Sequence, residues 1–201
     1  ALGVDARAAF DAAVAAQRKR LALPDAQDWW RLELAAALGA LARWLHSRGE
    51  DPSQPAAEWG TILEESTATE LGSTFLGDAW LERAAFDASR GADAQPALDR
   101  AMAQFRNVLA RNRADVEARA ALAEALLRQA EFRRERGEDA RDGFRAALKA
   151  CEESQRQWQK NLRATRHGFT RAERRRFGLG GTEQRAARGA TAARRALGRG
   201  G

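Results

Sequence analysis

The sequence predicts an all-α protein built from a repeated pair of antiparallel helices. Alanine is very frequent among the 201 residues, tyrosine is absent, and only 4 residues are proline. Alanine is the strongest helix former, and the β-branched residues that favour strands are scarce in this chain. A short motif that ends one helix and starts the next recurs along the chain. Together these observations predict about seven helices within residues 1–162.

The recurring motif contains an aromatic residue, then Arg-Gly four and five residues later, then an aspartate two residues after the glycine. Its three copies place the glycine at Gly49, Gly91 and Gly137, with spacings of 42 and 46 residues. Glycine just after a helix end can adopt the left-handed conformation, and a preceding arginine complements the negative end of the helix dipole. The aspartate can then cap the following helix. Each copy therefore predicts a tight corner between two helices.

Apolar residues recur at equivalent positions on both sides of each corner, at spacings of three and four residues. Such spacings place the apolar side chains on one face of a helix. First helices are expected at about 28–48, 74–90 and 115–136, and second helices at about 52–70, 94–111 and 140–162. One further helix at about 5–21 precedes them without a partner. We therefore expect the chain to be a fragment of a larger protein.

The residues before each corner resemble the first helix of the tetratricopeptide (TPR) repeat family, and one later segment resembles its second helix. The matching segments are Leu34-Ala35-x-x-Leu38, Leu76-Gly77-x-x-Trp80, Leu122-Ala123-x-x-Leu126 and Ala101-x-x-x-Phe105-x-x-Val108. The repeats here are longer than the family's 34 residues, and the usual opening tryptophan and closing proline are missing. The longer hairpins resemble the carboxy-terminal repeat regions of bacterial serine/threonine kinases of the eukaryotic type.

The resemblance implies a right-handed superhelical stack of helix hairpins, a TPR-like α-solenoid. It would comprise a partial repeat at 3–25 and repeats at about 28–71, 72–113 and 114–162. First helices would line a concave groove that binds a protein or peptide. Candidate groove residues are Trp29, Thr74, Asp78, Glu117, Glu124 and Arg128.

Carboxylates among these candidates predict a mildly acidic groove that would attract a basic or mixed peptide. Two alternatives stay open: the carboxylates are ordinary solvated helix charges, and Trp29 packs between repeats instead of anchoring a ligand. The residues with which the family clamps a partner's terminal carboxylate are absent at the matching positions.

The end of the chain differs sharply in charge from the rest. Residues 1–154 carry 21 Lys and Arg against 26 Asp and Glu, net −5, whereas residues 155–201 carry 13 against 2, net +11. Residues 163–201 are rich in Arg, Gly and Ala and offer little to bury. We therefore expect a basic tail that is largely disordered after a short helix near 170–177. A frameshifted or truncated end is the alternative explanation of this composition.

No arrangement typical of an enzyme, metal or cofactor site is found in the sequence. His46 and His167 lie far apart, and Cys151, the only cysteine, falls on an apolar helix position. Neighbouring carboxylates such as Glu64 and Glu65 diverge by about 100° around a helix, so they cannot flank one substrate. We expect no catalytic, metal-binding or cofactor-binding residue and no small-molecule substrate.

The sequence therefore predicts a non-catalytic protein–protein interaction scaffold, cytoplasmic and without a membrane segment. One alternative is the regulatory TPR region of a bacterial serine/threonine protein kinase, with a catalytic domain upstream in the parent chain. The less favoured alternative is nucleic-acid binding through the basic tail, whose arginines could contact phosphates but which offers only Phe169 and Phe177 for base stacking.

Overall fold

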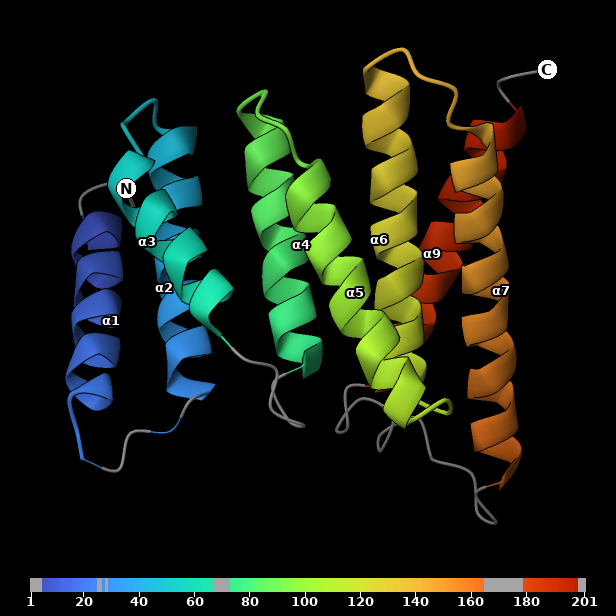
Figure 1. Cartoon of the computed structure of the whole chain (residues 1–201), viewed down its shortest axis with the longest axis horizontal. Coiled ribbons are helices and arrows are strands. Elements are labelled where there is room, and N and C mark those ends of the chain that lie inside the picture. Colours follow the sequence, from blue (N-terminus) through green and yellow to red (C-terminus); the bar gives the residue numbers. More distant parts are fainter. Residues whose placement is uncertain (1–4, 25–26, 28, 67–72, 165–178, 199–201) are drawn as a thin grey trace. The chain divides into compact units, whose positions relative to one another are not determined.

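A computed structural model describes residues 5–24, 27, 29–66, 73–164 and 179–198, and these residues form helices and turns without any strand (Figure 1). The all-α prediction is therefore confirmed. The helices are α1 (Asp5–Leu21), α2 (Trp29–Ser47), α3 (Ser53–Glu65), α4 (Ser73–Ser89), α5 (Gln95–Arg111), α6 (Val116–Glu135), α7 (Arg141–Ala164) and α9 (Leu179–Gly198).

The chain divides into two compact units, residues 1–94 and residues 95–201. In the first unit, α2 packs against α1, α3 and α4, and α3 also contacts α4. In the second unit, α6 packs against α5, α7 and α9, and α7 also contacts α9 (Figure 1). The pairs α2–α3 and α6–α7 thus form two of the three predicted hairpins. The third predicted pair, at 74–90 and 94–111, is split between the two units and stays a prediction.

Trp59 of α3 organises the core of the first unit. Trp59 is 1% exposed, and its indole packs against Phe86 in a tilted arrangement, with ring centroids 5.9 Å apart and planes at 52°. It also lies directly over Gly39 of α2, where an added Cβ would be 2.9 Å from the indole Cε2 atom. The absence of a side chain at this position therefore allows the close packing of α2 and α3.

Each predicted corner has the same backbone geometry. Gly49, Gly91 and Gly137 have φ angles of 73°, 70° and 77°, and they are the only described residues with positive φ. At the first corner, the amide of Glu50 donates to the carbonyl of Leu45 at 2.9 Å and that of Gly49 to His46 at 3.0 Å. Equivalent pairs of bonds close the other two corners. This pattern is the Schellman motif, and it confirms the predicted role of the three glycines.

The aspartates of the motif act slightly differently from the prediction. Asp51 accepts a bond from the amide of Ser53 at 2.9 Å, and Asp139 accepts one from Arg141 at 3.0 Å. Each carboxylate therefore lies one position before the N-cap and bonds the first helical amide. Pro52, expected in the first turn, is itself the N-cap of α3, and its carbonyl accepts the first helical bond from Ala56.

Two helix ends differ from the sequence prediction. Helix α3 ends at Glu65, although the prediction extended it to about residue 70, because Ser66 takes an extended conformation and its hydroxyl binds the carbonyl of Ile62 at 2.7 Å. Residues 179–198, assigned to a largely disordered tail, form α9. The short helix expected near 170–177 lies outside the described residues.

Burial follows the predicted stripes closely. In the second unit, Leu98, Ala101 and Phe105 of α5 are buried, as are Phe144 and Ala147 of α7. The stripe is less regular in α1, where Val14 is buried and the neighbouring Ala13 is exposed. With only one large aliphatic side chain in its middle, α1 turns this valine toward α2 and leaves the alanine in solvent.

Candidate functional site

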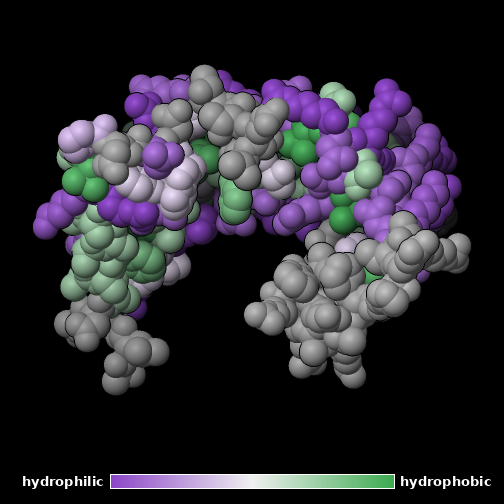
Figure 2. All heavy atoms as spheres, turned by 90° about the horizontal axis from the view of Figure 1, so that it is seen from below, coloured by the Kyte–Doolittle hydropathy of each residue, from purple (hydrophilic) through white to green (hydrophobic). Residues whose placement is uncertain are grey.

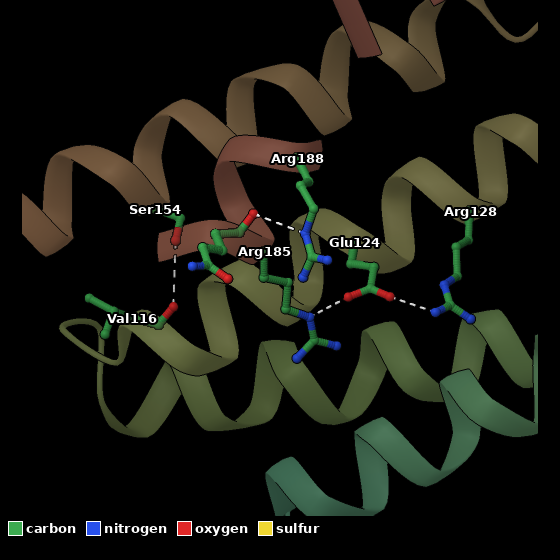
Figure 3. Close-up of polar contacts among 7 residues, drawn as sticks. Val116, Glu124, Arg128, Ser154, Arg185 and Arg188 are labelled. Atoms are coloured by element: carbon green, nitrogen blue, oxygen red, sulfur yellow. Dashed lines mark hydrogen bonds and ion pairs between the residues drawn. The ribbon is translucent and has the colours of Figure 1, made fainter. Parts of the chain in front are cut away.

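Glu124, one of the predicted groove residues, lies at the centre of a polar contact between α6 and α9 (Figure 3). Its carboxylate accepts a bond from Arg128, one turn further along α6, at 2.6 Å, and forms an ion pair with Arg185 of α9. The side chains of Glu124 and Arg185 are each about three-quarters buried. The structure thus brings Glu124 and Arg128 together, and it adds an arginine that the sequence analysis had placed in a disordered tail.

The electrostatics of Glu124 follow from this arrangement. Burial alone would raise the pKa of its carboxyl group, but the guanidinium groups of Arg185 and Arg128 outweigh burial and lower the pKa below its usual value. Glu124 is therefore ionised at neutral pH, and its charge is shared between its own helix and α9.

A second ion pair joins α9 to α7, so that α9 packs on both helices of one hairpin, along a surface that we term the α6–α7 groove. Arg194 of α9 donates to Glu152 of α7 at 2.9 Å. Arg185 and Arg194 are nine residues apart, which is about 13 Å along a helix. One arginine therefore contacts α6 and the other contacts α7, so both walls hold the same helix.

Between the two arginines, α9 presents only small side chains to the groove. Ala186, Ala190 and Ala193 are 2%, 1% and 0% exposed. Ala193 packs in a cluster with Leu127 of α6 and Phe144 of α7. The floor of the groove is therefore apolar, and Glu124 of α6 and Glu152 of α7 flank it.

Gly189 of α9 lies close to α7. A Cβ added to Gly189 would lie 2.8 Å from the Sγ atom of Cys151, which is too close unless the cysteine side chain or a helix shifts. The buried position raises the pKa of the Cys151 thiol to about 11, so the thiol stays protonated and unreactive at neutral pH. Cys151 is thus a packing residue, as its apolar helix position predicted.

The remaining predicted groove residues are spread over both units. Glu117 is exposed near the start of α6, while Thr74 and Asp78 are half-buried on α4 of the first unit. Trp29 opens α2 and is 47% exposed, although it contacts Trp30 edge-on and lies 5.5 Å below the guanidinium of Arg20. Trp29 therefore combines local packing with an exposed face, so both of its expected roles are compatible with its position.

Apart from these positions, one face of the molecule carries mainly polar side chains among the described residues. Figure 2 shows hydrophilic side chains over much of one face of the molecule, interrupted by small hydrophobic areas. The large hydrophobic side chains that the structure describes as exposed are Leu23, Trp29 and Phe75. All three belong to the first unit.

The first unit also contains a cleft of about 370 Å³ between α1 and α3. Leu38, Leu41 and Leu45 of α2 form its apolar floor. Two ion pairs border it: Arg18 of α1 lies 2.5 Å from Glu58 of α3, and Arg7 of α1 lies 3.7 Å from Glu50 in the corner between α2 and α3. The cleft is therefore a gap in helix packing that charged side chains cross.

Among the residues that the structure describes, no three His, Cys, Asp or Glu side chains lie close enough to hold a metal ion. None of the described helices has both the length and the apolar character that a membrane-spanning helix requires. Comparison with protein-family models, with curated proteins and with solved structures found no match.

Proposed function

We propose that this chain is a protein-binding scaffold of TPR-like helical repeats that holds a segment of a partner protein against its first helices. The observation that carries the proposal is the contact between Glu124 and α9. A position expected to bind a partner already holds a helix through a partly buried ion pair. The face of α6 therefore has the chemical properties that a binding groove requires.

The repeated corners support the repeat part of the proposal. Three corners with one backbone geometry recur at 42 and 46 residues, and at two of them the helices on either side, α2–α3 and α6–α7, pack as neighbours. Repeats that use the same corner present their first helices in similar ways, which is how helical-repeat proteins build extended binding faces.

The charges of the second unit support a protein partner over a nucleic acid. Arg185 and Arg194 belong to the basic tail whose phosphate contacts were the alternative hypothesis. Both arginines are engaged by carboxylates, Glu124 and Glu152, and both pairs lie within one unit. Neither charge is free to contact phosphate while α9 is in place.

The proposal can be tested by capture of a partner with the full chain from a lysate of the source organism. A variant with Glu117→Lys and Trp29→Ala changes two exposed groove positions, whereas Arg106→Glu changes an exposed residue of α5 and serves as the control. Circular dichroism should show that all three proteins are equally helical. We expect a protein that binds the wild type and the control but is lost from the groove variant. Equal recovery with all three proteins would refute the assignment of the groove.

A binding titration then shows whether the partner binds the groove directly or was recovered through another protein. The recovered partner is purified and titrated against the same three proteins, with an expected loss in affinity of at least tenfold for the groove variant only. A steep fall in binding with salt together with nuclease-sensitive recovery would instead point to nucleic acid.

A further inference from the structure

Helix α9 is held by unusually little apolar surface compared with its neighbours. The fully buried residues of α9 are alanines and one glycine, and its Leu197 packs against the core only partly buried, whereas α7 inserts Phe144 and Trp158 into the same unit. None of the largest fully buried side chains of the described residues comes from α9. The hydrophobic effect scales with buried apolar area, so α9 is bound more weakly than α7.

The sequence of α9 also lowers its own helical stability. Gly180, Gly181 and Gly189 lie within the helix, and glycine is a poor helix former. The two ion pairs that hold α9 differ in burial, since Arg185 and Glu124 are largely shielded but Arg194 and Glu152 are about half exposed. Exposed pairs contribute little. We therefore expect α9 to leave the groove without unfolding α6 and α7.

The groove nevertheless selects its occupant by several independent features. It needs a residue without a side chain opposite Cys151, alanines on either side of it, and two arginines nine residues apart, one for Glu124 and one for Glu152. A helix with a leucine at the position of Gly189 would not fit, because even one methyl group added there lies 2.8 Å from the Sγ atom of Cys151.

From these observations we infer that the α6–α7 groove is a binding site for a small-faced basic helix of a partner protein, and that α9 is the resident occupant that this helix displaces. The inference rests on the proposed function and names its partner class. The partner helix carries a glycine or alanine face between two arginines at a spacing of nine residues. Binding of the partner is then controlled by the stability of α9 in the groove, because a tethered segment competes at high effective concentration.

A labelled peptide with the sequence of residues 179–198 serves as the probe. It is titrated into the full wild-type chain and into a full chain with Arg185→Glu and Arg194→Glu, whose own α9 is repelled by Glu124 and Glu152. We expect the variant to bind the peptide at least tenfold more tightly than the wild type. A peptide carrying the same two charge reversals is the control and should bind neither chain.

Cys151 provides an independent readout of the empty groove. Its thiol is buried against Ala190 and Ala123, so a maleimide should label it slowly in the wild type and at least tenfold faster in the charge-reversed chain. Adding the wild-type peptide should slow labelling again. Hydrogen exchange of α6 and α7 in the same variant shows whether these helices stay folded, and fast labelling with unprotected α6 and α7 would overturn the inference.

The contact between Gly189 and Cys151 allows a test of which residue of the bound helix lies opposite Cys151. A peptide with Gly189→Ala gains helix propensity but should lose binding at least tenfold. Binding should recover on a charge-reversed chain that also carries Cys151→Ala, since this change removes Sγ. Equal binding of both peptides to both chains would overturn the proposed geometry.

Hydrogen exchange on the unmodified protein gives a test that needs no variant. We expect the open state through which the amides of α9 exchange to be at least tenfold more populated than the open state through which the amides of α6 and α7 exchange. Identical protection would show that α9 is an integral part of the unit, and the inference would fail. A wild-type dimer that dissociates when Arg185 and Arg194 are changed to Glu would also overturn the inference, because two copies of the chain would then swap their α9 helices. If the captured partner still binds in that case, the proposed function stands.

Discussion

Replacing Gly137 with alanine measures how strongly the corner between α6 and α7 depends on a left-handed backbone. Gly137 has a φ of 77°, and a Cβ placed on it would meet no atom within 4 Å. The cost therefore comes from backbone conformation and not from crowding. A left-handed residue other than glycine costs about 1–2 kcal/mol, and the lower entropy of the unfolded chain offsets about 0.4–1 kcal/mol of this. We expect a net destabilisation of about 1 kcal/mol.

The assay is urea denaturation followed by far-ultraviolet circular dichroism, with hydrogen exchange to assign the change to the second unit. Gly198→Ala is the matched control, because Gly198 also has open space around its Cβ position but no positive φ. Alanine there should stabilise α9 by up to about 1 kcal/mol. Gly137→Asn should cost less than Gly137→Ala, since asparagine tolerates the left-handed region. Changes of equal sign for Gly137→Ala and Gly198→Ala would refute the reasoning.

Further expectations concern the first core and the pH dependence of the groove. Gly39→Ala gains up to about 1 kcal/mol of helix propensity but overpacks the Trp59 indole at a cost of about 1–3 kcal/mol, so urea denaturation should show a net loss. Trp59→Ala removes a fully buried indole and should cost about 3–5 kcal/mol in the same assay. The folded pKa of Glu124 lies below 4.5, so its stabilising effect is present above that pH and disappears as pH falls through the folded pKa. Maleimide labelling of Cys151 should therefore accelerate on acidification relative to an exposed thiol standard, and Glu124→Gln should remove this acceleration.

The helices and their corners were predictable because their signals are local and strong. Glycine at the end of a helix adopts the left-handed conformation without the steric cost of a side chain, and all three motif glycines adopt it. The apolar stripes of α5 and α7 contain large side chains, so their helical period stands out against the charged residues between them. By contrast, the apolar residues of α1 are mostly alanines, which favour a helix without showing which side faces the core.

The groove could be predicted only in part. Glu124 and Arg128 were identified from their place on a first helix, and they do contact each other. Arg185 was missed because its segment was assigned to disorder on composition. The small residues Ala186, Ala190 and Ala193 have helical spacing, but alanine is so frequent in this chain that such spacing also arises without any packed partner. Only the packing of α9 against α6 and α7 shows that these three alanines form a buried face.

The fit between α9 and the groove bears on whether the end of the chain is an accident of a shifted reading frame. In residues 155–201, 13 of the positions are basic, and a segment unrelated to the groove would place some of them against its apolar floor. Instead, the four fully buried positions are alanine or glycine, Leu197 adds a partly buried apolar side chain, and Arg185 and Arg194 each meet a carboxylate. Burial of a single unpaired arginine would oppose docking strongly. The match of size and charge from Arg185 to Leu197 therefore argues that α9 evolved together with α6 and α7.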